Sequence, residues 1–167
     1  MSSTLEKAAN IFLIIASVVV VSQYAYRTVH ESEVQWKTAV DPGYRVENRA
    51  AFDLDTAPST MLIFTSHTCQ FCRASMPFYR KAAAAARKRG TRVVAVTWEN
   101  PAENRKFLES NGITVDKIVR GSTSGVPVTD VPSLVLLRRD GSVIDSWAGQ
   151  PQSGSYERKV LQVIDGV

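Results

Sequence analysis

The sequence has few cysteines and few histidines, with two of each among its 167 residues. Two thiols cannot form a multi-bridge disulfide scaffold, nor a zinc or iron-sulfur site that takes four thiolates from one chain. Glycine and proline, at nine and seven residues, are near average usage, which excludes a collagen-like repeat and a proline-rich linker protein. The remaining balance, 44% apolar and 22% charged, is typical of one globular domain.

Basic residues are only slightly more numerous than acidic residues. The formal net charge is +4, and the basic residues form no long block interleaved with aromatics, so we expect no nucleic-acid partner. Some basic residues do gather in one expected helix, as a solvated face or as a surface that steers acidic partners or lipid headgroups. They are Arg80, Lys81, Arg87, Lys88 and Arg89.

The N-terminal region carries the longest apolar run, from Ile11 to Val21, within a stretch from Ala8 to Tyr26 that has no formal charge. As a helix this stretch is roughly 28 Å long, about the thickness of a bilayer core. It predicts a tail at residues 1–7 and a single-pass transmembrane anchor at residues 8–26. A cleaved signal peptide is the alternative, because the run is short and Val20 to Ser22 resembles a cleavage site. A buried helix of the domain is disfavoured because the run has no polar face.

Two signals conflict over the orientation of this anchor. Only Lys7 precedes the span, whereas Arg27, Lys37 and Arg45 follow it, which by charge alone favours a cytoplasmic C-terminal side. A cysteine pair favours an oxidising compartment. We predict an extracytoplasmic C-terminal domain, on the periplasmic side of the inner membrane if the protein is bacterial.

The rest of the chain predicts a tether at residues 27–58 that leads into a domain at residues 59–167. Alternating strand and helix patterns predict a parallel strand pair, and a hairpin follows them. The expected strands are 61–64, 92–97, 133–137 and 142–147, the expected helices are 73–89, 102–110 and 156–164, 113–119 fits a short strand or a turn, and 121–129 fits a loop. The predicted fold class is α/β, with a mixed sheet flanked by helices.

Cys69 and Cys72 begin the first of these helices, where the positive end of the helix dipole favours a thiolate. We expect Cys69 to be the nucleophile that forms a mixed disulfide, and Cys72 to resolve it. Two other readings stay open. One is a structural disulfide, although so short a loop yields little entropic stabilisation. The other is a metal site with Cys69, Cys72 and His67.

Four features together resemble the thioredoxin fold, from about Thr60 to the C-terminus: a buried strand, the Cys-x-x-Cys at a helix start, Pro77 within that helix, and Val131-Pro132 before a hairpin. The resemblance implies that Pro132 is cis and packs beside the cysteines, and that the backbone of Val131 binds the substrate strand. With its N-terminal span, the chain is similar to membrane-anchored TlpA-like thiol-disulfide oxidoreductases of bacterial envelopes, which include reductases for cytochrome c maturation.

The chain departs from that family at several positions. It has Thr68 where the family has tryptophan, and Gln70-Phe71 between the cysteines. Ile63 and Ser75 occupy positions where relatives carry an acid, so the proton acceptor is not evident. His67 and Glu99 are the candidates to replace it.

The predicted function is disulfide exchange with protein substrates, with the reductase direction favoured and a redox partner protein supplying or accepting electrons. The resemblance implies no dissociable cofactor and no metal. The alternative is a thioredoxin-fold module that binds a partner or a metal without redox turnover.

Overall fold

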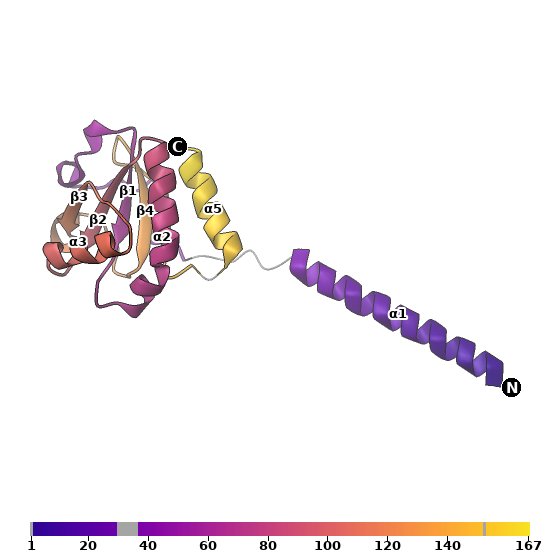
Figure 1. Cartoon of the computed structure of the whole chain (residues 1–167). Helices are drawn as coiled ribbons and strands as arrows, with labels where there is room; N and C mark the ends of the chain where they lie inside the picture. The colour runs from indigo at the N-terminus through magenta and orange to yellow at the C-terminus, as the bar shows by residue number, and fades with distance from the viewer. Residues whose placement is uncertain (1, 30–36, 152) are drawn as a thin grey trace. The chain divides into compact units, whose positions relative to one another are not determined.

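Figure 1 shows the computed structural model of the chain, which describes residues 2–29, 37–151 and 153–167. The chain divides into two compact units, Met1–Gln35 and Trp36–Val167. The first unit contains helix α1, Ser2–Val29, and the second contains the sheet.

Helix α1 includes the range predicted as an anchor and extends beyond it at both ends. Its large apolar side chains between Ile11 and Val21, and the ring of Tyr24, are exposed. Among the residues that the structure describes, no helix combines the length and the apolar character needed to cross a membrane. The transmembrane anchor predicted at residues 8–26 is therefore not confirmed.

Five strands form one mixed sheet in the order β3-β2-β1-β4-β5. They are β1 Ser59–Phe64, β2 Arg92–Thr97, β3 Lys117–Arg120, β4 Ser133–Arg138 and β5 Val143–Ala148. β1, β2 and β3 are parallel, and β4 and β5 continue the sheet as antiparallel neighbours on the other side of β1. The predicted mixed sheet is confirmed. Every residue of β1 is buried, which explains its continuous apolar run.

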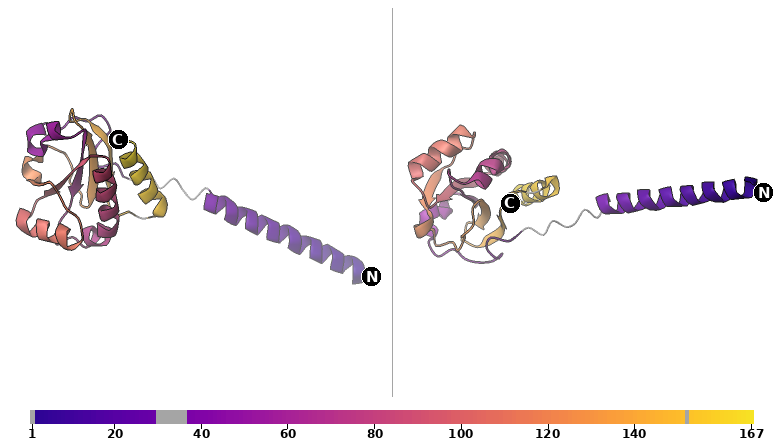
Figure 2. Two further views of the ribbon diagram at one scale, coloured as in Figure 1. Left: turned by 45° about the horizontal axis from the view of Figure 1, so that its top comes forward. Right: turned by 90° about the horizontal axis from the view of Figure 1, so that it is seen from below.

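One face of the sheet is covered by three helices, α2 Gln70–Lys88, α3 Pro101–Ser110 and α5 Gly154–Asp165. Figure 2 shows them side by side along this face, with α2 between the other two. Their apolar side chains form a common core with β1 and β2, to which Met76, Leu108 and Val160 contribute. All three helices were expected from the sequence, with slightly shorter ranges.

The other face is covered by the segment that the sequence predicts as a tether. Within residues 37–58, the side chains of Val40, Val46, Phe52 and Leu54 are buried against this face. The segment contains two short 3-10 helices, η1 Arg49–Phe52 and η2 Leu54–Thr56. Burial of a phenylalanine such as Phe52 contributes about 2 to 3 kcal/mol to folding.

The same segment also pairs with the outer edge of the sheet. Isolated bridges join Lys37 to Ala148 and Arg45 to Ser142, which gives the edge strand β5 a partner on its open side. Residues 37–58 therefore belong to the domain, and the tether prediction differs from the structure there. Irregular backbone has no hydrophobic period, so the sequence pattern does not reveal this packing. Residues 30–36 of the predicted tether lie outside the described residues.

Two shorter elements were less clear from the sequence. β3 forms at the end of the range 113–119, for which a strand and a turn both fit the sequence. The predicted loop 121–129 begins with a short helix, α4, Gly121–Ser124.

Candidate active site

The site lies where β1 ends and α2 begins. Cys69 is the N-cap of α2, and its Sγ accepts a hydrogen bond from the backbone N–H of Cys72 at 3.3 Å. The first intrahelical bond runs from the N–H of Arg73 to the carbonyl of Cys69 at 3.1 Å. The helix therefore begins at Gln70, earlier than the predicted start at residue 73, because the Cys-x-x-Cys residues form its first turn.

The two cysteines are free thiols with different surroundings. Cys69 is partly exposed, whereas Cys72 is completely buried. Burial raises the pKa of Cys72 to about 12, and the neighbouring Cys69 adds to the rise. Polar interactions with the backbone of Ser66 and the side chain of Thr65 lower the pKa of Cys72 and oppose this shift only in part. One sulfur is therefore accessible, while the other is held as a protonated thiol.

The loop before β4 brings Val131 and Pro132 to the cysteines. The Val131–Pro132 peptide bond is cis, as the resemblance implies. The Cys69 thiol points to the carbonyl of Val131, with 3.9 Å between Sγ and the oxygen. The carbonyl of Pro132 accepts a hydrogen bond from Gly149 at 2.8 Å, which attaches the loop to the end of β5. All four predicted site residues thus lie together, and their roles in catalysis stay predictions.

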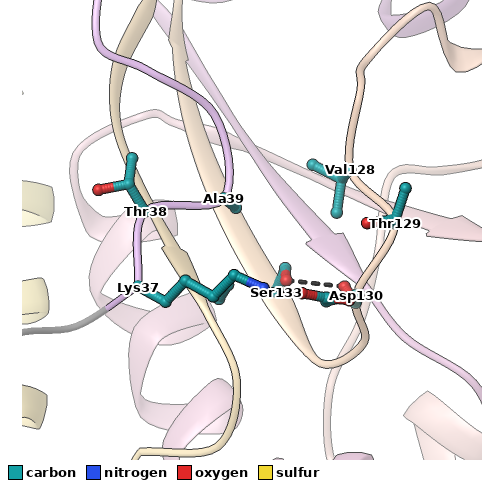
Figure 3. Close-up of a pocket in the computed structure, with 8 residues that line it drawn as sticks. Lys37, Thr38, Ala39, Val128, Thr129, Asp130 and Ser133 are labelled. Atoms are coloured by element: carbon teal, nitrogen blue, oxygen red, sulfur yellow. Dashed lines mark hydrogen bonds and ion pairs between the residues drawn. The ribbon is translucent and has the colours of Figure 1, made fainter.

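A small pocket of about 80 Å³ lies beside this loop (Figure 3). The Lys37 ammonium is 2.6 Å from the Asp130 carboxylate, and Ser133 Oγ donates to the Asp130 carbonyl at 2.7 Å. The residues that line the pocket are Lys37, Thr38, Ala39, Val128, Thr129, Asp130, Ser133 and Ala148. Sequence reasoning missed this contact, since the two ends of the ion pair are far apart along the chain. The Lys37 and Asp130 side chains are both well exposed, so their ion pair contributes little to stability.

A carboxylate holds the residues that precede Cys69. Glu99 Oε1 accepts hydrogen bonds from the hydroxyls of Ser66 and Thr68, both at 2.6 Å, and Oε2 accepts one from the N–H of His67 at 2.9 Å. His67 Nδ1 is also 2.6 Å from Oε2, and its Nε2 is 3.6 Å from Glu103. Burial alone raises the pKa of Glu99, but the three hydrogen bonds and the charge of His67 together lower it.

Two interpretations that the sequence leaves open are a proton acceptor for the cysteines and a metal site. Among the described residues, the Glu99 carboxylate contacts residues 66–68 rather than a cysteine sulfur. In the part of the chain that the structure describes, no cluster of three or more histidine, cysteine or carboxylate side chains is placed to hold a metal ion.

Three of the basic residues in and directly after α2 contact acids elsewhere in the domain. Lys81 pairs with Glu157, Arg87 with Asp116 and Arg89 with Asp165, at 3.1, 3.2 and 3.6 Å. Arg73 donates instead to the carbonyl of His67 at 3.2 Å. These partners reduce the net positive field expected from the sequence of this helix.

Two exposed aromatic side chains follow the carboxyl ends of β1 and β2. Phe71 lies between the cysteines and is 54% exposed, and Trp98 is 47% exposed. The Trp98 indole packs on Phe64, with ring centroids 6.0 Å apart, and against Gly121. A Cβ atom at Gly121 would lie 2.3 Å from the indole, so the glycine permits this position.

No family model matches the chain, and no curated protein matches it. Solved structures do. A Chlorobium tepidum protein described as thiol:disulfide interchange protein DsbE matches with 20% identity and a TM-score of 0.54, over 75% of this chain and 99% of that one. A DsbF homologue from Corynebacterium diphtheriae matches with 15% identity and a TM-score of 0.54, over 81% and 90%. A secreted Mycobacterium tuberculosis disulfide oxidoreductase homologous to E. coli DsbE matches with 17% identity and a TM-score of 0.52, over 69% and 85%.

The chain has a thioredoxin-like fold. The thioredoxin-like domain comprises the mixed sheet with the helices on one face and residues 37–58 on the other. At these identities the similarity establishes the fold alone, because one fold hosts many different activities.

The difference between the two thiols leads to a test by alkylation. Because burial raises the pKa of Cys72 to about 12, we expect iodoacetamide at pH 8 to modify Cys69 and spare Cys72 in the folded, reduced protein. Fragment-ion mass spectra assign the modified cysteine, and in urea both thiols should react.

The raised pKa of Cys72 also predicts how stability depends on pH. Since the Cys72 thiol ionises near pH 9.0 in the unfolded chain and near 12 in the folded one, the free energy of unfolding should fall as pH rises between these values.

The Cys69→Ala variant is the control for the alkylation experiment, and it should remain unlabelled until urea is added. Equal labelling of both thiols in the folded protein would contradict the assignment of Cys72 as the protected thiol.

Proposed function

We propose that the protein is a thiol-disulfide oxidoreductase that exchanges disulfides with protein substrates through Cys69 and Cys72. The observation that carries the proposal is the difference between the two sulfurs. Cys69 is accessible and caps a helix N-terminus, whereas Cys72 is buried one turn later, next to it. An accessible attacking thiol and a protected resolving thiol are what sequential disulfide exchange requires.

The reaction proceeds in two exchange steps. The Cys69 thiolate attacks one sulfur of a substrate disulfide, so that a mixed disulfide forms and the other substrate sulfur leaves as a thiolate. Cys72 then loses its proton to solvent and attacks the Cys69 sulfur. The Cys69–Cys72 disulfide forms, the second substrate thiolate leaves, and two electrons have passed to the substrate. A redox partner protein returns the pair to the dithiol.

The surroundings of Cys69 support a protein as the substrate. The cis-Pro loop offers the backbone of Val131 beside the sulfur, where an extended substrate segment can form main-chain hydrogen bonds. Exposed Phe71 and Trp98 provide apolar surface nearby along the same edge of the sheet.

Single-cysteine variants test the two roles. Cys69→Ala should abolish disulfide reduction, because no accessible nucleophile remains. Cys72→Ala should accumulate a mixed disulfide with a substrate protein, visible as a higher band on a non-reducing gel that disappears with dithiothreitol. Each variant is the matched control for the other. Full activity of Cys69→Ala would overturn the assignment, and inert thiols in the parent protein would favour a binding module.

The reductase direction is the second part of the proposal, and it rests on the resemblance to TlpA-like reductases. A reductase needs a Cys69/Cys72 couple near the thioredoxin value of roughly −270 mV, whereas an oxidant lies near −120 mV. We expect equilibration with graded glutathione or dithiothreitol buffers to place the couple closer to the first value. A value near −120 mV would reverse the proposed direction while leaving the exchange chemistry intact.

The third part is the location, in which the N-terminal segment anchors an extracytoplasmic domain to a membrane. The exposed apolar side chains between Ile11 and Val21 support it, because contact with water is unfavourable for them. The full chain should sediment with membranes and resist carbonate extraction, whereas a chain lacking residues 1–29 should remain soluble. External protease should digest the domain in spheroplasts. Protection of the domain would reverse the orientation, and a shortened mature N-terminus would indicate a cleaved signal peptide.

A further inference from the structure

The loop of residues 66–68, which joins β1 to Cys69, is held by a side chain from another part of the sheet. Glu99 follows β2, and its carboxylate accepts three hydrogen bonds of 2.6 to 2.9 Å from this loop. Two come from the hydroxyls of Ser66 and Thr68, and one comes from the N–H of His67. One carboxylate therefore contacts every residue between Thr65 and Cys69.

Hydrogen bonds from the loop, with a smaller contribution from His67, favour the ionised form of this carboxylate. The Glu99 side chain is 24% exposed, and the pKa of the carboxyl is lowered because the hydrogen bonds and His67 outweigh the effect of burial. The His67 ring lies between Glu99 and Glu103, and Arg73 donates to the His67 carbonyl. Hydrogen bonds to an ionised acceptor are stronger than those between neutral groups, so this attachment is firm.

We propose that Glu99 is a positioning residue for Cys69, which holds residues 66–68 so that the Cys69 sulfur stays at the N-terminus of α2. Thr68 precedes Cys69 directly, and the capping contact from Cys72 N–H to Cys69 Sγ is only 3.3 Å. If the loop is released, Cys69 can leave the capping position, and its sulfur loses the helix N–H group. This inference rests on the proposed function, because Cys69 is the nucleophile that is positioned.

Loss of positioning and loss of charge shift the pH midpoint of Cys69 alkylation in opposite directions when Glu99 is replaced. A carboxylate near a sulfur disfavours the thiolate, so removal of its charge alone should shift the pH midpoint of Cys69 alkylation downward. Loss of the helix N-terminus should shift that midpoint upward. The direction of the shift therefore separates positioning from charge.

The experiment compares Glu99→Ala and Glu99→Gln with the parent chain. We expect Glu99→Ala to raise the pH midpoint of Cys69 alkylation by about one unit. Below the midpoint this lowers the thiolate fraction about tenfold, and because the more basic thiolate is also more nucleophilic, the exchange rate falls roughly threefold. Glu99→Gln should show a smaller rise. Its amide oxygen can still accept from the two hydroxyls, but its NH₂ group cannot accept from His67 N–H. Far-UV circular dichroism and the urea midpoint monitor folding.

Glu103→Gln is the matched control. The Glu103 carboxylate lies beside the same histidine, whereas the hydroxyls of Ser66 and Thr68 donate to Glu99 instead. It should leave the exchange rate within about twofold of the parent. A double-mutant cycle of Glu99→Ala with Thr68→Ala should be non-additive, since both changes remove the hydrogen bond between Thr68 and Glu99.

A lowered or unchanged midpoint in folded Glu99→Ala would overturn the proposal. If that variant does not fold, a lowered or unchanged midpoint in Glu99→Gln would do so. The alkylation midpoint does not depend on turnover. A parent chain without exchange activity would therefore overturn the proposed function, while the shift would still test whether Glu99 positions Cys69.

Discussion

The site depends on a sulfur atom at the N-cap of α2, a position that most helices give to an oxygen. The Cys69 sulfur accepts from the N–H of Cys72, which otherwise has no partner within the helix. The helix end favours negative charge, so the interaction is strongest when Cys69 carries the charge of a nucleophile. The capping geometry and the chemistry of the site thus require the same placement of one atom.

Three separate parts of the chain fix that placement. The buried strand β1 directs the chain to the helix, the cis-Pro loop brings the carbonyl of Val131 to the thiol, and the Glu99 carboxylate holds the residues between strand and helix. Because β1 is central and paired on both sides, its end is a rigid support. A site that must hold a reactive group precisely is well served by such a support.

The sheet itself is stable only if both of its faces are covered. Helices cover one face, and residues 37–58 cover the other with apolar side chains and edge pairing. The Asp53 carboxylate adds a polar attachment, 3.0 Å from Lys117 and 3.5 Å from Arg92 at the starts of β3 and β2. Hydrogen bonding to Lys117 lowers the pKa of Asp53, so this attachment persists to mildly acidic pH. The segment before β1 therefore also supports the strand that leads to Cys69.

The sequence by itself determined the mixed sheet, the helices and the place of Cys69 and Cys72, because these depend on local hydrophobic period and on residue spacing. The strand at 92–97 formed with the bounds that its apolar run predicts. The sequence also named His67 and Glu99, but their contact with each other and with the loop required β1 and β2 to be adjacent. The packing of residues 37–58 and the Lys37–Asp130 pair were decided only by the tertiary structure, because they join irregular segments that are distant in sequence and carry no periodic signal.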